Sequence, residues 1–360
     1  MLKALSREFL RIACLWSIWA GLLGAANIVP QRAIAQEAVV DFYKGKQIKI
    51  LVGAGPGGGY DLYSRGLAER LGAYIPGNPT IIVQNQPAAG SIVAANTVYT
   101  TLPQDGTVIA AFQPGALFDQ ILGSTTTRFE TTKFHWLGSM NQEAAVAITY
   151  KPSKVQTFDD LMKHESIFGM SGPNTTEQYT SLLRHLFGAK IKQIAGYESV
   201  TKIYPGVERG ELEGLTTLWG SIKASVPHWV RDKHINVLVQ FSFDRQPDLP
   251  DTPMISDYFT PARLQPGYSV EETRAMMRFI VAPQAIAWPF AFGPGVPADR
   301  VDMMRAALKA TTQDREFLAM MQKLKREVNF LDGVTVQKMF EEAANTPKET
   351  LAKIGSITKP

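Results

Sequence analysis

Thiols are almost absent from this chain, which has a single cysteine, Cys14, in 360 residues. Cys14 lies inside an apolar run near the start of the chain, too early and with Arg11 wrongly placed for a lipid-attachment site. The residues after position 35 contain no cysteine, so they can form no disulfide and must be stabilised by a hydrophobic core of their own. Thiol catalysis and cysteine-ligated metals are excluded for that part of the chain.

Patterns for metal and nucleic acid are missing as well. The five histidines show neither H-x-x-x-H nor H-E-x-x-H spacing, so we expect no catalytic metal. The net charge is +4, but residues 1–35 carry +3 of it, which leaves about +1 for the rest. With no basic run and no basic stripe interleaved with aromatics, we expect no nucleic-acid partner. Beyond residue 35 no second apolar run is long enough to span a membrane, so we expect a soluble mature protein.

The first 35 residues have the features of a secretory signal. A basic head precedes an apolar run from Ile12 to Val29, and Ala33-Ile34-Ala35 supplies the small residues of a cleavage site. We therefore predict cleavage after Ala35 and a mature chain that begins at Gln36. The alternative is an uncleaved anchor, because about 18 apolar residues can just cross a bilayer.

Strands and helices alternate along the rest of the chain in two series. The first series runs from Gln47 to Phe112 and the second from Ala145 to Leu218, each with the spacing of βαβ units. A strand over Ile235–Phe241 and three C-terminal helices follow. The pattern predicts an α/β protein with two domains, each a mainly parallel sheet flanked by helices.

A glycine cluster follows the first strand, Gln47–Val52, and comes directly before a helix that contains Asp61. Glycines at 53, 55, 57, 58 and 59 let the backbone turn sharply and approach a ligand closely. The first turn of the helix leaves N–H groups unpaired, and these groups favour an anion. We therefore predict an anion-binding loop in which Asp61 shapes the turn, since a carboxylate would repel the ligand.

Two other motifs compete with this interpretation. Gly53 to Gly58 formally match G-x-G-x-x-G, but the next strand ends in Gln84-Asn85-Gln86 without the acidic residue that a dinucleotide site needs, so we expect no cofactor. Ser171 lies one residue short of a nucleophile elbow and is followed by Pro173, and no triad can be assigned. For Tyr179, Tyr197 and Trp219, a core role and a ligand-facing role both stay open.

Several motifs together resemble those of the substrate-binding proteins of tripartite tricarboxylate transporters, the TctC or Bug family. In chain order they are Ile48-Lys49-Ile50-Leu51-Val52 with Gly57-Gly58-Gly59-Tyr60-Asp61 and Arg65; Val83-Gln84-Asn85-Gln86-Pro87-Ala88-Ala89-Gly90; Pro103-Gln104-Asp105-Gly106-Thr107; and Gly295-Val296-Pro297-Ala298-Asp299-Arg300. The loop Phe168–Thr176 is similar to the family's small-residue ligand loop, whereas Ala195-Gly196-Tyr197-Glu198-Ser199 departs from its V-P-Y-x-G motif.

The resemblance implies a two-lobed, type II-like periplasmic binding fold. One lobe would comprise residues 36–140 plus 241–360 and the other residues 141–240, with the ligand cleft between them. The first-lobe loop would bind through Gly57, Gly58, Gly59, Tyr60 and Asp61, and the second-lobe loop through Gly172, Thr175 and Thr176. Gln113, Tyr197 and Glu198 would line the cleft.

The resemblance also implies a periplasmic protein that closes on a small carboxylate and delivers it to integral membrane transporter subunits. We expect a monomer and no enzymatic activity. Dicarboxylic, tricarboxylic, aromatic and other organic acids stay open as ligands, and Glu198 would favour a ligand with an amine or hydroxyl. The rival classes are a secreted hydrolase or isomerase on a similar frame and a sensory binding protein that feeds a receptor.

Overall fold

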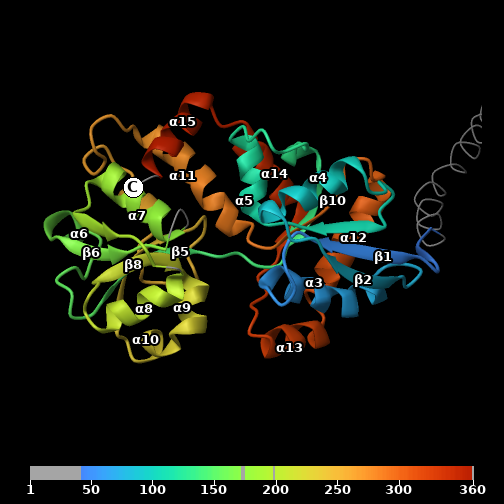
Figure 1. Cartoon of the computed structure of the whole chain (residues 1–360), viewed down its shortest axis with the longest axis horizontal. Helices are drawn as coiled ribbons and strands as arrows, with labels where there is room; N and C mark the ends of the chain where they lie inside the picture. The colour runs from blue at the N-terminus through green and yellow to red at the C-terminus, as the bar shows by residue number, and fades with distance from the viewer. Residues whose placement is uncertain (1–41, 172–174, 198, 359–360) are drawn as a thin grey trace, which may run out of the picture.

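The computed structural model describes residues 42–171, 175–197 and 199–358. The predicted signal sequence and its cleavage after Ala35 lie outside the described residues, as do Gly172 and Glu198. The described residues form two β-sheets side by side, each flanked by helices (Figure 1). The predicted α/β architecture is confirmed.

The first sheet has six strands in the order β11-β4-β10-β3-β1-β2. Its strands are β1 (Gln47–Val52), β2 (Thr80–Asn85), β3 (Val108–Ala111), β4 (His135–Ser139), β10 (Pro289–Phe292) and β11 (Leu331–Asp332). The helices of this half are α3 (Gly59–Arg70), α4 (Ile92–Thr100), α5 (Pro114–Ile121), α12 (Ala298–Thr311), α13 (Arg315–Lys323) and α14 (Gly333–Ala344), with short 3₁₀ segments η1 (Leu71–Tyr74), η2 (Ala89–Ser91) and η3 (Thr131–Lys133). Every residue of β3 is buried, as expected of a strand covered on both faces.

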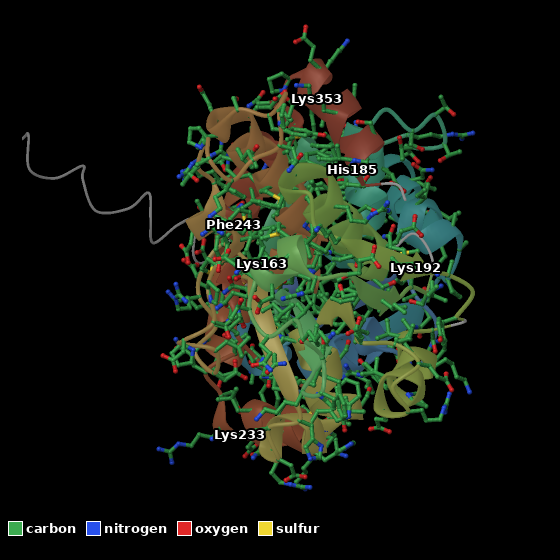
Figure 2. All side chains as sticks on the ribbon, turned by 90° about the vertical axis from the view of Figure 1, so that its left-hand side faces the viewer. Lys163, His185, Lys192, Lys233, Phe243 and Lys353 are labelled. Atoms are coloured by element: carbon green, nitrogen blue, oxygen red, sulfur yellow. The ribbon has the colours of Figure 1, made fainter. Side chains whose placement is uncertain are left out.

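The second sheet has five strands in the order β7-β6-β8-β5-β9. They are β5 (Ala145–Tyr150), β6 (Ser166–Gly169), β7 (Ile191–Ile194), β8 (Gly214–Leu218) and β9 (Ile235–Phe241). The helices around this sheet are α6 (Asp160–Lys163), α7 (Thr175–Phe187), α8 (Val200–Glu208), α9 (Trp219–Ser225) and α10 (Pro227–Arg231). The outer end of this half carries exposed lysines, among them Lys163, Lys192 and Lys233 (Figure 2).

Both sheets are mixed, although most of their strands share one direction. In the first sheet β1 pairs in parallel with β2 and β3, whereas β10 is antiparallel to β3 and β4. In the second sheet β6 is parallel to β7 and β8, whereas β5 is antiparallel to β8 and β9. The antiparallel strands β5 and β10 are those by which the chain enters the second sheet and returns to the first. Neither strand is joined to its sheet neighbours through a βαβ unit. The prediction of parallel strands, which came from the spacing of such units, therefore does not hold for β5 and β10.

The chain passes between the two sheets three times. Residues 140–144 join β4 to β5, residues 242–288 join β9 to β10, and residues 345–347 join α14 to α15 (Lys348–Ile357). Helix α14 packs on β4, whereas α15 packs on α7 and on α11 (Val270–Ala285), which lies above and between the sheets in Figure 1. The hydroxyl of Tyr179 on α7 donates to the carbonyl of Ile280 on α11 at 3.2 Å. Helix α11 is therefore fixed to the second-sheet side while it also contacts α5 and α14.

The segment between β9 and α11 also contacts the second half. The ring of Tyr258, in the 3₁₀ segment η4 (Ile255–Tyr258), stacks on Phe158 with centroids 3.8 Å apart. Gln265 N–H donates to the carbonyl of Leu186 at 2.8 Å. Over the described residues, no helix combines the length and the apolar character that a membrane span requires.

Candidate ligand-binding site

The carboxyl ends of β1, β2 and β3 meet at one edge of the first sheet, where Ser91 joins the loops that follow them. The Ser91 hydroxyl donates to the carbonyl of Gly53 at 2.8 Å and accepts from the backbone N–H of Gln113 at 2.9 Å. Ser91 is fully buried and has a φ of 86°, in the left-handed region. A side chain at Gly53 would collide with Ser91, so glycine is required there.

Asp61 holds the glycine loop from inside. It is 2 % exposed, and one of its oxygens, Oδ2, accepts from the N–H of Gly57 and from Arg65 Nε, both at 2.8 Å. The other oxygen accepts from the Asn85 amide at 3.0 Å, and that amide also donates to the carbonyl of Ala54. Burial raises the pKa of Asp61, but the hydrogen bonds from Arg65, Gly57 and Asn85 outweigh it and hold the pKa below its usual value. Asp61 is thus a charged support of the loop, with its carboxylate turned inward.

The start of α3 carries peptide groups without a partner. Within the described residues, the N–H groups of Gly58, Gly59, Tyr60 and Asp61 have no hydrogen-bond acceptor. Pro56, Gly57 and Gly58 are exposed. Gly57 has a φ of +80°, and a Cβ placed there would meet nothing within 4 Å. Four N–H groups without an acceptor therefore lie at the positive end of α3, next to the exposed residues Pro56, Gly57 and Gly58, which is an arrangement suited to an anion.

Gly59 and Tyr60 face the protein instead. A side chain at Gly59 would collide with the ring of Trp288. The ring of Tyr60 lies 4.5 Å from that of Trp288, and its hydroxyl donates to the carbonyl of Ala287 at 3.0 Å. Burial raises the pKa of Tyr60, which keeps the phenol neutral. At these two positions, which were predicted to bind a ligand, only the backbone N–H groups are left to do so.

The second-sheet loop is shaped by threonines. Thr176 is fully buried, and its hydroxyl accepts from the N–H of Ser171 at 2.9 Å. Its carbonyl accepts from the hydroxyls of Thr180 and Thr216 at 2.7 and 2.9 Å. Thr175 is half-buried at the start of α7. Thr176 therefore orders the loop, while Gly172, also predicted to bind a ligand, lies outside the described residues.

The aromatic candidates separate clearly. Tyr179 is fully buried, and Trp219 is 4 % exposed with its indole N–H donating to Asp248 at 2.8 Å. Both therefore belong to the core. Tyr197 is half-buried, with its hydroxyl beside Gly206 of α8. Gln113 precedes α5 at the same sheet edge as the glycine loop.

A polar hollow of about 980 Å³ lies between the two halves, and no sequence motif pointed to its charged residues. Lys223 of α9 lies 2.7 Å from Glu327 on the first-sheet side and 3.0 Å from Asp248. Glu143, in the first crossing, also lines the hollow. Its burial, and secondarily Glu327, raise the pKa of Glu143 to about 7, despite opposing effects from Lys223, the Gly220 N–H and Asn141. The one sequence signal is an acidic residue two positions before the apolar strand β5.

The site offers no constellation for metal chemistry. In the part of the chain that the structure describes, no three or more histidine, aspartate or glutamate side chains are grouped so that they could hold a metal ion. The arrangement around α3 can bind an anion through peptide N–H groups, and the parallel-strand edges of both sheets supply the loops.

Comparison with solved structures defines the class. A TctC solute-binding protein from Polaromonas aligns with a TM-score of 0.67 at 16% identity, covering 86% of this chain and 99% of that one. The R. palustris protein Rpa4515, solved with adipate, aligns at 0.55 and 18% identity over 86% and 97%. The periplasmic binding protein BugD aligns at 0.54 and 18% identity over 87% and 99%. The chain therefore has the two-lobed fold of periplasmic binding proteins.

Sequence comparison leads to the same group. No family model matches the chain. A UPF0065 protein of Bordetella bronchiseptica is 22% identical over 292 residues, 76% of this chain and 75% of that protein. A UPF0065 protein of Bordetella pertussis is 35% identical over 85 residues, which span 22% of this chain and 24% of that protein. The resemblance to TctC and Bug proteins, which the motifs indicate, is confirmed.

Proposed function

We propose that this chain is a periplasmic solute-binding protein that captures a small carboxylate by closure of its two lobes. The lobes would be residues 36–140 plus 241–360 and residues 141–240. The anion favours the closed form because only that form brings both loops into contact with it. No bond is made or broken in this cycle.

The observation that carries the proposal is the set of unpaired N–H groups at Gly58, Gly59, Tyr60 and Asp61. A carboxylate oxygen can accept from two or more of them, with bridging water completing its shell. Arg65, one turn further along α3, is already hydrogen-bonded to Asp61, so we do not assign it the role of a clamp. Recognition through peptide groups places few demands on the rest of the acid, which agrees with a neighbour that binds adipate.

The ligand class that we propose is a dicarboxylate, a tricarboxylate or an aromatic or other organic acid. On the second lobe, Gly172 and Thr175 would add backbone donors, with Glu198, Tyr197 and Gln113 at the walls. We further propose a monomer that is exported to the periplasm, is cleaved after Ala35 and delivers its ligand to integral membrane transporter subunits.

A thermal-shift screen of the chain from Gln36 onward tests this function. An acid present at about 100 times its Kd adds about 2.7 kcal/mol to the stability, which corresponds to about 4 °C in Tm for a chain of this length. The panel contains C4 to C6 dicarboxylates, citrate, benzoate and amino acids. A panel without any shift, or steady turnover of an ester or carboxylate by the same preparation, would contradict a binding protein for small acids.

A further inference from the structure

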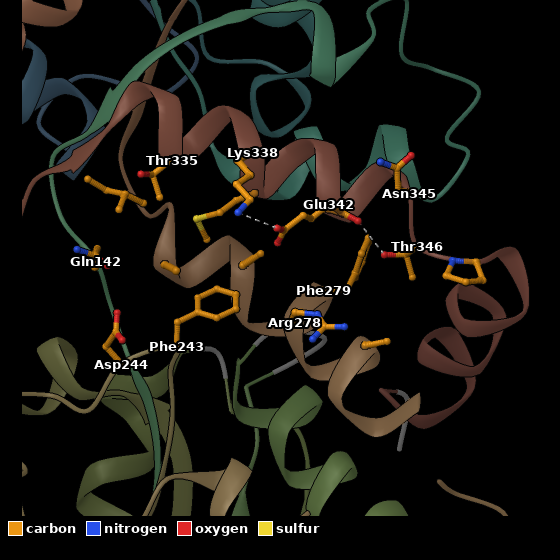
Figure 3. Close-up of a pocket in the computed structure, with 17 residues that line it drawn as sticks. Gln142, Phe243, Asp244, Arg278, Phe279, Thr335, Lys338, Glu342, Asn345 and Thr346 are labelled. Carbon is orange, nitrogen blue, oxygen red and sulfur yellow. Dashed lines mark hydrogen bonds and ion pairs between the residues drawn. The ribbon is translucent and has the colours of Figure 1, made fainter. Parts of the chain in front are cut away.

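A second cavity, separate from the glycine loop, lies where the chain crosses between the two halves. Its walls include residues from all three crossings: Gln142 from the first, Phe243 and Asp244 from the second, and Asn345, Thr346 and Pro347 from the third. Helices α11 and α14 form its two long sides (Figure 3). Its volume is about 650 Å³, within the range of small-molecule sites.

We call this cavity the hinge pocket, and the side chains that α11 and α14 contribute to it are mainly apolar. On α11, Ala275, Ala282 and Ala285 leave space because their side chains are small, and Phe279, 5 % exposed, lies between them. Met339 and Ala343 of α14 line the opposite side. The ring of Phe243 points toward the space between the helices and is 42 % exposed, so it offers apolar surface to a ligand (Figure 3).

Charged side chains of both signs line this apolar pocket: Arg278 and Lys338 are cations, and Asp244 and Glu342 are carboxylates. Arg278 is exposed and, within the described residues, its guanidinium makes no hydrogen bond or ion pair. Lys338 lies 3.7 Å from Glu342, a long and solvent-exposed pair. A smaller hollow of about 130 Å³ shares Phe243 and Arg278 and adds Arg274. Flat apolar surface beside an unpaired guanidinium suits a ligand that has an apolar body and one anionic group.

We propose that the hinge pocket is a second ligand site, which binds an amphipathic monoanion: an aryl or short alkyl body with one carboxylate or sulfonate. The body packs between Phe243 and Phe279, and the anionic group accepts from Arg278. This site goes beyond the proposed capture of a carboxylate, and the binding it predicts does not depend on the glycine loop.

The probe for the test is 8-anilinonaphthalene-1-sulfonate, which has an aromatic body and one sulfonate. Its fluorescence is titrated with the folded chain from Gln36 onward. We expect one probe per chain. Arg278→Gln should weaken binding about five- to tenfold, and Phe243→Ala, at an exposed position that folding tolerates, should weaken it similarly. Ala275→Phe fills the cavity and should abolish the site.

Matched controls separate the pocket from other surfaces. Arg315→Gln and Ala319→Phe make the same changes at exposed positions of α13 and should leave the titration unchanged. Gly58→Asp should also leave it unchanged, because it alters only the glycine loop. Parent-like binding by Arg278→Gln and Phe243→Ala overturns the proposal, as does loss of the probe from Gly58→Asp, which would place it in the cleft. Neither result would alter the outcome of the carboxylate screen.

Discussion

Replacement of Gly58 tests the anion loop most directly, because this glycine can be changed without strain. It precedes the first residue of α3 with φ −77° and ψ 173°, which is the usual conformation of an N-cap. A Cβ at Gly58 would lie 3.7 Å from the carbonyl of Gly55, an ordinary contact. In contrast, Gly57 has a positive φ and Gly59 packs against Trp288, so their substitution would disturb the fold itself.

The pair Gly58→Asp and Gly58→Asn separates charge from shape. Both are favoured N-cap residues, so we expect each variant to be as stable as the parent or up to about 1 kcal/mol more stable. In both variants the new side chain also accepts from one of the N–H groups that would otherwise bind the ligand. The aspartate additionally repels it: two charges about 6 Å apart near a surface interact by about 1–3 kcal/mol, less in salt. We therefore expect Asp to bind the acid about 5- to 50-fold more weakly than Asn.

The assay is calorimetric titration with an acid that the thermal-shift screen identifies. Ser269→Asp is the matched control, since it adds the same charge at the N-cap of α11. There the Ser269 hydroxyl accepts from the Glu272 N–H at 3.1 Å. This control should bind like the parent. Equal affinities for the Asp and Asn variants, in proteins that melt normally, would refute the placement of the anion at the start of α3.

Three further predictions concern buried polar groups. Ser91→Ala leaves the Gln113 N–H and the Gly53 carbonyl without their partner and should lower the free energy of unfolding by about 1–3 kcal/mol in urea titrations, whereas a parent-like midpoint would show that water replaces the hydroxyl. The Tyr74 hydroxyl and Arg70 hold the pKa of Asp314 below its usual value, so the ionised Asp314 stabilises the fold at neutral pH, and this contribution is lost as the pH falls below about 4. Asp314→Asn should lower the free energy of unfolding at neutral pH by about 1–3 kcal/mol and make stability depend less on pH below about 4. Glu143, with its pKa raised to about 7, favours folding while protonated, so stability should fall by about 2–3 kcal/mol from pH 4.5 to 7, and Glu143→Gln should abolish that slope.

The sequence located the regular elements where local pattern decides them. Strands β1, β5 and β9 begin and end at the predicted residues, because each is an apolar run bounded by polar or turn residues. Helix α11 has no counterpart among the elements that the sequence predicts, although Ser269 caps it and Glu271 and Glu272 lie in its first turn. Pro283, which usually ends a helix, falls inside its last turn. Strand β10 has only four residues, the first a proline, and exists because β3 and β4 lie on either side of it.

The site was predictable only in part, for the same reason. The glycine loop follows from residues adjacent in sequence, as does the inward role of Asp61. The hydrogen bonds of Ser91 and Asn85 join loops 22 to 38 residues apart, and they depend on the order β3-β1-β2, which no local pattern specifies. Thr176 is predicted to bind the ligand as part of the second-lobe loop, and in the structure its hydroxyl accepts from the Ser171 N–H of the same loop. Spacing alone does not reveal which side of a loop faces the ligand.

The sheet order also has a consequence for biosynthesis. Strands β1 to β4 are made first, then the whole second sheet, and only afterwards β10, which lies between β3 and β4. The second sheet can therefore form while the first still lacks β10, so that the facing edges of β3 and β4 are unpaired. Such edges attract other strands. The chain should need protection from aggregation until β10 is available to pair with β3 and β4, and a truncation before β10 should be insoluble even though every residue of the glycine loop is present.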